Sequence, residues 1–134
     1  MAGGRPLILL DTCTLLWLTM APEQLSPAAR KALADPNTQV WLSPVTGFEI
    51  GQKHAAGKLE LPFAPAEWME RALRSHTLDV MPLEMAIALR AAALPRLHND
   101  PFDRLLIATA QEHHLVLLTP DPKIRAYPAL KTRW

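Results

Sequence analysis

The sequence predicts an α/β fold in which a mostly parallel sheet is covered by helices on both faces. Short, continuous apolar runs such as LILL at residues 7–10 are typical of strands that are buried on both sides. These runs alternate with longer segments of helical periodicity, and this alternation is the pattern of parallel sheets. The chain has 134 residues, of which 49% are hydrophobic. This is enough for a core, so we expect a single domain over residues 1–134.

The first half of the chain predicts the order strand, helix, helix, strand, helix. These elements span residues 6–11, 12–20, 25–35, 39–43 and 44–57. Ser26 followed by Pro27 is the preferred cap and first residue of a helix. Pro44 likewise opens the third helix, and Gly57 ends it. The second and third of these helices therefore have local start signals, and the third also has a local stop signal.

The second half continues the alternation and adds a final short strand. The predicted elements are helices over 62–76, 83–95 and from residue 100 onward, and strands over 77–83, 114–119 and 129–134. Apolar residues at helical spacing, such as Trp68, Met69 and Ala72, indicate the first of these helices. Pro95 ends the second helix, and no linker or repeat interrupts the pattern.

Charge and cysteine content limit the classes of function. Lys and Arg number 14 against 13 Asp and Glu, so a net charge of +1 gives no global signature of nucleic-acid binding. The single cysteine, Cys13, allows no intrachain disulfide or cysteine-based zinc cluster. The apolar run near the N-terminus ends at Asp11 and is too short for a signal peptide or a membrane span. We therefore expect a cytoplasmic protein that does not enter a membrane.

Acidic residues stand where the predicted strands end. Asp11 directly follows the first strand, Asp121 follows a later one, and Glu49 lies roughly one turn into the helix after a third. Helical side chains lean toward the N-terminus, so Glu49 still reaches the strand ends. Asp103 opens the helix that leads to the Asp121 strand. Because parallel sheets bind ligands beyond the carboxyl ends of their strands, we expect all four acids at one edge.

Four carboxylates at one edge would repel each other unless a cation lay among them. No Lys or Arg is obviously placed to neutralise all four. Oxygen ligands without a cysteine or a convincing histidine pair favour Mg²⁺ or Mn²⁺ over zinc. Such ions hydrolyse phosphodiester bonds by activating water and stabilising the departing oxygen. The residues thus predict a metal-dependent phosphodiesterase.

Helix capping offers another explanation for each acid. Asp100, Pro101 and Asp103 have the positions of a cap, a first helical residue and a first-turn acid. Thr46 and Glu49 have the spacing of a capping box, provided that the helix starts at Thr46 instead of Pro44. Asp11 and Asp121 fit a cap and a turn. We predict different roles for the two aspartates at the start of this helix. Asp100 is the cap, and Asp103 is directed toward the sheet.

Four successive motifs resemble those of PIN-domain proteins, specifically the VapC-like toxins of bacterial toxin–antitoxin pairs. They are LLDTCTLLWL, LSPVTGFEIGQKHAAGKLEL, HNDPFDRLLIATA and LVLLTPD, and they cover nearly the whole chain in order. The resemblance places the family's four acids on Asp11, Glu49, Asp103 and Asp121, and it places Asp100 in a DPFD subset. Cys13 and Phe48 depart from the family pattern, which often has Asn or His at the first position and Trp at the second.

This resemblance implies a three-layer α/β/α sandwich and an Mg²⁺- or Mn²⁺-dependent endoribonuclease. It also implies a homodimer and a cognate antitoxin that occupies the active site. Thr12 and Thr119, which flank two of the acids, are candidates for hydrogen bonds to carboxylates or metal waters, although strand-end capping explains them equally. Arg104 is a candidate contact to an RNA phosphate, although a solvated surface position is the alternative.

Two other functions remain open from the residues. A phosphatase would use Asp11 as its nucleophile, but such enzymes commonly want a second acid where Cys13 stands. A catalytically silent binding module would use the acids only as helix caps and would bind a partner protein.

Overall fold

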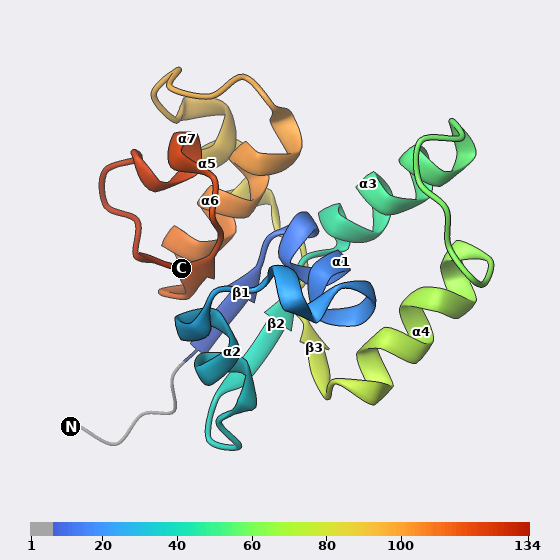
Figure 1. Cartoon of the computed structure of the whole chain (residues 1–134). Coiled ribbons are helices and arrows are strands. Elements are labelled where there is room, and N and C mark those ends of the chain that lie inside the picture. Colours follow the sequence, from blue (N-terminus) through green and yellow to red (C-terminus); the bar gives the residue numbers. More distant parts are fainter. Residues whose placement is uncertain (1–6) are drawn as a thin grey trace.

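The fold is an α/β/α sandwich around one parallel sheet, as predicted (Figure 1). The computed structural model describes residues 7–134, so residue 6, where we expected the first strand to begin, lies outside the described part. The sheet has the order β3-β2-β1-β4-β5 with every neighbouring pair parallel. Its strands are β1 Leu7–Leu10, β2 Gln39–Leu42, β3 Leu78–Val80, β4 Val116–Leu118 and β5 Thr132–Arg133.

The helices form where the sequence predicted them, with two short additions. They are α1 Thr12–Met20, α2 Pro27–Ala34, α3 Pro44–Ala55, α4 Pro65–Ser75, α5 Met85–Ala93 and α6 Pro101–His113. The additions are the 3-10 helix η1, Pro22–Gln24, and α7, Pro122–Arg125. We had explained the region of α7 by turn chemistry alone. The helix is a single turn, too short to show the apolar periodicity on which the prediction relied.

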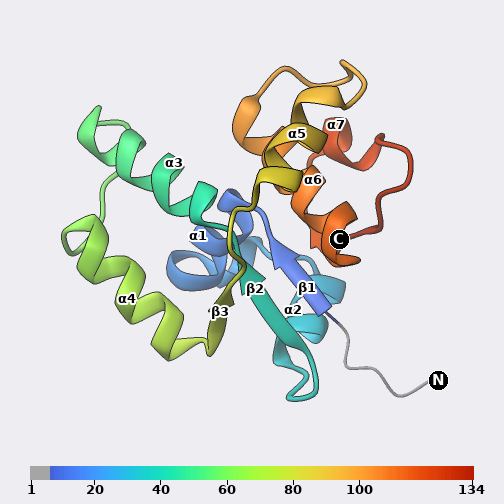
Figure 2. The same cartoon turned by 180° about the vertical axis from the view of Figure 1, so that it is seen from behind.

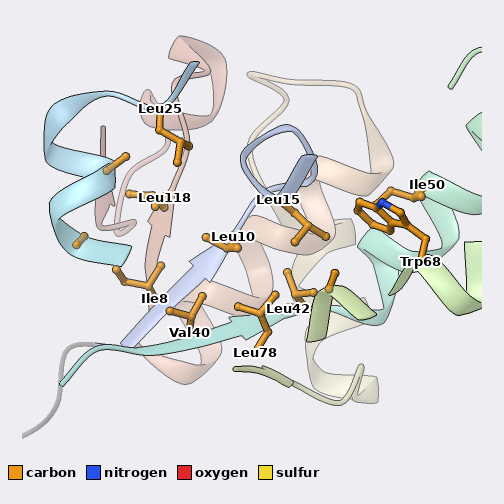
Figure 3. Packing of buried hydrophobic residues seen from close by; sticks show 13 residues of the cluster. Ile8, Leu10, Leu15, Leu25, Val40, Leu42, Ile50, Trp68, Leu78 and Leu118 are labelled. Atoms are coloured by element: carbon orange, nitrogen blue, oxygen red, sulfur yellow. The ribbon is translucent and has the colours of Figure 1, made fainter. Parts of the chain in front are cut away.

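Alternate residues of the strands supply two separate cores. Ile8 and Leu10 of β1 belong to a cluster with α1, α2 and α4, which Figure 3 shows around Leu15, Leu25 and Trp68. Leu9, between them, belongs to a second cluster with α6 and α7. Side chains of a strand point alternately to opposite faces, so both faces of β1 are covered. Figure 2 shows α5, α6 and α7 gathered at one side, while α3 and α4 extend from the other.

The sheet order places β1 at a switch point. The chain leaves β1 toward β2 on one side, and later returns to place β4 on the other. Connections that diverge in this way leave a crevice beyond the carboxyl ends of the strands, where α/β proteins bind their ligands. Asp11 directly follows β1, at the centre of this edge.

Local capping residues define the helix starts. Asp100 accepts hydrogen bonds from the backbone N–H of Phe102 (2.9 Å) and Asp103 (3.4 Å), which confirms it as the cap of α6. Ser26 caps α2 as predicted, and Ser43 caps α3. The capping-box explanation of Glu49 is therefore wrong. Because α3 begins at Pro44, Glu49 lies in its second turn and is free to face another element.

No helix within residues 7–134 is long and apolar enough to cross a membrane.

The cap predicts a measurable contribution of Asp100 to stability. Asp100→Ala should lower the free energy of unfolding by about 1 kcal/mol. Asp100→Asn should change the free energy of unfolding by only roughly a few tenths of a kcal/mol, because Asn is an equally good cap. Both variants remove the Asp100 charge from the neighbourhood of Asp103, so their difference in urea unfolding isolates the cap. Equal stabilities of the two variants would contradict the capping role.

Candidate metal centre

Asp11 is buried at the end of β1 and serves as the N-cap of α1. Its Oδ1 accepts the backbone N–H of Thr14 at 2.8 Å, and the Sγ of Cys13 lies 3.8 Å from its Oδ2. Burial raises the pKa of Asp11, and hydrogen bonds from Thr119 and Thr14 oppose that shift only in part. Burial and the neighbouring Asp11 also raise the pKa of Cys13 to about 12, so the thiol stays protonated. Capping and a place at the sheet edge thus coexist in one residue.

Glu49 reaches across from α3 to α1. The Thr12 hydroxyl donates to its Oε1 at 2.7 Å, and the Lys53 Nζ lies 2.8 Å from its Oε2. We expected no Lys or Arg to neutralise all four acids, and Lys53, one turn further along the same helix, pairs with Glu49 alone among them. The hydrogen bond to Glu49 raises the pKa of Lys53, so its ammonium remains charged. Glu49 is the acid whose charge is directly balanced by a basic side chain.

Asp103 and Asp121 meet at a histidine that the sequence analysis did not identify. His98 Nε2 lies 2.7 Å from Asp103 Oδ2 and 3.8 Å from Asp121 Oδ2. One donor atom from each of the three side chains lies within 4.8 Å of the others, an arrangement that could hold a metal ion. His98 stands five residues before Asp103 in the HNDPFD motif. The closeness of His98 to Asp103 in the sequence was the available signal. Helical and strand periodicities do not predict which side chain of a helix a loop residue will contact.

The Asp103 carboxylate carries unfavourable charge. Burial raises its pKa to about 6, the hydrogen bond from His98 lowers it, and the charges of Asp100 and Glu49 raise it again. The charge of Asp103 is also felt at Cys13 and Lys53. These mutual effects show that α1, α3 and the start of α6 bring their acidic side chains into one electrostatic neighbourhood. A cation in this region would relieve the repulsion, so the residues fit a divalent metal.

Arg104 has a structural role in place of the phosphate contact that we considered. Its guanidinium donates to the carbonyl oxygens of Ala91 (2.8 Å), Leu94 (2.9 Å), Pro95 (3.0 Å) and His98 (3.2 Å). Buried carbonyls at a helix end require such donors, and one guanidinium supplies several in a fixed geometry. Arg104 therefore ties the end of α5 and the following loop to α6, and both of its terminal nitrogens donate hydrogen bonds.

The two flanking threonines contact the acids or their backbone. Thr12 bonds to Glu49, as described, and also lies 3.2 Å from the Thr46 hydroxyl. Thr119 accepts the backbone N–H of Asp121 at 3.1 Å. Asp121 in turn accepts the N–H of Lys123 and caps α7. Thr119 thus holds the turn at Asp121 and also hydrogen-bonds to Asp11, and Thr12 holds the Glu49 carboxylate.

An aromatic pair borders the acids. The rings of Phe48 and Phe102 meet edge to face with their centroids 5.6 Å apart, and Phe48 is 63% exposed. Each ring immediately precedes an acid of the site, Glu49 or Asp103. Phe48 therefore presents apolar surface to solvent one residue before Glu49.

Comparisons with known proteins agree with this arrangement. A family model described as PIN domain matches residues 8–130. The chain is 30% identical over 131 residues to Ribonuclease VapC22 of Mycobacterium tuberculosis (strain ATCC 25618 / H37Rv), covering 95% of this chain and 98% of that protein.

Two solved structures are similar over the whole fold. One is VapBC2 from Rickettsia felis bound to a DNA fragment from its promoter. It has a TM-score of 0.73 at 14% identity and covers 95% of this chain and 97% of that one. The other is a toxin–antitoxin complex from Klebsiella pneumoniae. It has a TM-score of 0.63 at 25% identity and covers 95% of this chain and 98% of that one.

The raised pKa of Asp103 predicts how the metal-free protein responds to pH. The folded state retains a proton up to about pH 6, whereas the unfolded state releases it near the ordinary value of 3.8. Stability therefore falls as the pH rises through this interval, and the full penalty is present above it. Asp103→Asn removes the penalty, so at about pH 7.5 with EDTA we expect an unfolding temperature about 2–5 °C above wild type.

Calorimetry of both proteins between about pH 5 and pH 7.5 measures this difference. Asp79→Asn, which changes an exposed acid on β3, is the matched control and should follow the wild-type curve. An Asp103→Asn protein that is no more stable than wild type at the higher pH would refute the charge penalty.

Proposed function

The chain belongs to the PIN domain family, and from this premise we propose that it is a metal-dependent endoribonuclease that acts as the toxin of a toxin–antitoxin pair. The observation that carries the proposal is the pair Asp103 and Asp121, which meet within one possible metal-binding group at the switch point of a parallel sheet. A relative that is 30% identical over almost its full length is a ribonuclease by name, which supports RNA as the substrate.

We assign Asp11, Glu49, Asp103 and Asp121 as the acids that hold Mg²⁺ or Mn²⁺. When bound, such an ion activates water as the nucleophile and stabilises the oxygen that departs from phosphorus. The chain's own contribution is to fix its carboxylates in advance. Asp11 is held by the Thr14 N–H, and Asp103 is held by His98. Fixed ligands lose little freedom when the ion and the substrate arrive.

Glu49 and Lys53 have complementary roles in this proposal. Thr12 and Lys53 occupy the two oxygens of Glu49, so its carboxylate is oriented from both sides. Lys53 is half exposed at its side chain, 47%, whereas that of Glu49 is 8% exposed. The Lys53 ammonium can therefore face both the buried Glu49 and a phosphate of the RNA backbone. A positive charge at that phosphate positions the substrate without reading its sequence.

The partners that we propose are an antitoxin protein and a second copy of the chain. The antitoxin follows from the similar structures, which are toxin–antitoxin complexes. A homodimer would cover apolar side chains that α5 leaves exposed, including Met85 at 74% and Leu89 at 65%. We place the protein in the cytoplasm, where RNA and a protein antitoxin are both present.

The phosphatase alternative finds no support in the surroundings of Asp11. That carboxylate is 4% exposed, and its oxygens face the Thr14 N–H and the Cys13 thiol. A nucleophilic oxygen must approach phosphorus along a free line, and a buried capping carboxylate lacks one. The alternative of a binding module differs from the nuclease in that its acids would have no catalytic role.

The decisive test is cleavage of bacterial RNA by folded protein that is free of antitoxin. We expect cuts with Mg²⁺ or Mn²⁺ and none with EDTA. Asp103→Asn should lower the rate on the order of 100-fold or more, because loss of a ligand exceeds the 10–100-fold effect of losing an outer hydrogen bond. Asp100→Asn, three residues away, keeps the cap and should retain activity within about threefold.

The two variants form a matched pair because both lose one carboxylate at the start of α6. If neither variant alters cleavage, the acids are not the catalytic groups. If folded wild type cuts no RNA with either metal, the nuclease proposal fails and the binding module becomes the better account.

A further inference from the structure

We propose that His98 is a nitrogen ligand of the metal ion, so that the site is a mixed imidazole and carboxylate centre. This inference rests on the proposed function, because it concerns the same metal site. It adds a residue that lies outside the four acids and that favours Mn²⁺ over Mg²⁺. Imidazole nitrogen suits transition metals, whereas Mg²⁺ prefers an all-oxygen shell.

The positions of the donor atoms support this assignment. Nε2 of His98 lies 2.7 Å from Asp103 Oδ2 and 3.8 Å from Asp121 Oδ2. Within residues 7–134, these three side chains form the one group of three or more His, Cys, Asp or Glu donors that could hold an ion. The donor atoms of His98 and Asp103 therefore already lie side by side, as ligands of one ion would have to.

The backbone of His98 is fixed more firmly than that of an ordinary loop residue. Its N–H donates to the Tyr127 hydroxyl at 2.9 Å, and its carbonyl accepts from Arg104 at 3.2 Å and from Tyr127 at 3.3 Å. Tyr127 is buried, and its hydroxyl also donates to Pro95 at 2.9 Å. Both backbone groups of His98 are therefore held by side chains from two other segments.

This support is what a metal ligand requires. Arg104 connects the loop to α5 and α6, and Tyr127 connects it to the segment after α7, so His98 is positioned by three parts of the fold. Residues that hold a coordinating side chain in place strengthen metal binding, because the side chain is already ordered before the ion arrives. The His98 side chain is 13% exposed, which leaves its ring few alternative positions.

The chemistry of the ring allows the exchange of partners. With its proton on Nδ1, a neutral imidazole presents the lone pair of Nε2 to an ion. When the ion binds, the proton that Nε2 donated to Asp103 would leave to solvent while Nδ1 carries the ring proton, so Asp103 would exchange the hydrogen bond from His98 for the cation. No other covalent or redox change accompanies binding. The competing role is that of a hydrogen-bond donor to Asp103 alone, with His98 remaining outside the metal shell.

Pulsed electron paramagnetic resonance of the Mn²⁺-loaded full-length protein separates these two roles. Directly bound ¹⁴N from an imidazole gives a coupling that an outer-shell histidine does not give. We expect this coupling in wild type and in His113→Gln, and we expect it to be absent in His98→Gln. His113 is the matched control because its Nε2 pairs with Glu84 at 3.0 Å and belongs to no metal group.

Calorimetric titration provides the second measurement. His98→Gln should bind Mn²⁺ about 10-fold or more weakly than wild type, while its affinity for Mg²⁺ changes by less than about threefold. Gln retains a side-chain amide that can donate to Asp103, so a purely structural role would leave both affinities nearly unchanged.

The outcomes distinguish this inference from the proposed function. Wild-type protein that binds Mn²⁺ and cleaves RNA but shows no ¹⁴N coupling overturns the ligand role and leaves the nuclease intact. A coupling that persists in His98→Gln overturns it as well, because the nitrogen then comes from another residue. Protein that neither binds Mn²⁺ nor cleaves RNA overturns both.

Discussion

Mutual repulsion among carboxylates at the carboxyl edge of the sheet is the constraint on which the surrounding structure depends. Asp103 is partly buried, and the negative charges of Asp100 and Glu49 raise its pKa. Three of the acids have partners of different kinds. A backbone N–H stabilises Asp11, an ammonium stabilises Glu49 and an imidazole stabilises Asp103. Removal of such groups from water is unfavourable unless each finds a partner, so the site shapes the helix starts and loops around it.

Capping and site chemistry are served by the same side chains. Asp11 caps α1 at the end of β1, and Asp121 caps α7 and lies in one group with Asp103 and His98. A helix start presents unpaired N–H groups, which favour a carboxylate, and in a parallel sheet the helices start beside the strand ends. The geometry of the fold therefore stabilises acids at the place where a cation would bind. Capping and metal binding are compatible explanations of these residues.

Basic residues near the site are used mainly to organise it. Arg104 donates hydrogen bonds to carbonyl oxygens at the end of α5 and in the loop that carries His98. Lys53 neutralises Glu49. The Phe48 and Phe102 rings, each next in sequence to an acid, meet edge to face, and Phe48 is largely exposed.

Local features of the sequence determined most of the fold. Apolar runs and caps depend on residues within about four positions of each other, so the strands, the six longer helices and the role of Asp100 as the cap of α6 followed from them. The tertiary structure decided which side chains meet. Thr12 and Glu49 are 37 residues apart, and Tyr127 and His98 are 29 apart. Their contacts depend on strand order, which local patterns do not encode. For the same reason, the contact of His98 with Asp103 and the structural role of Arg104 depend on the placement of the loop after α5 beside α6 and α7.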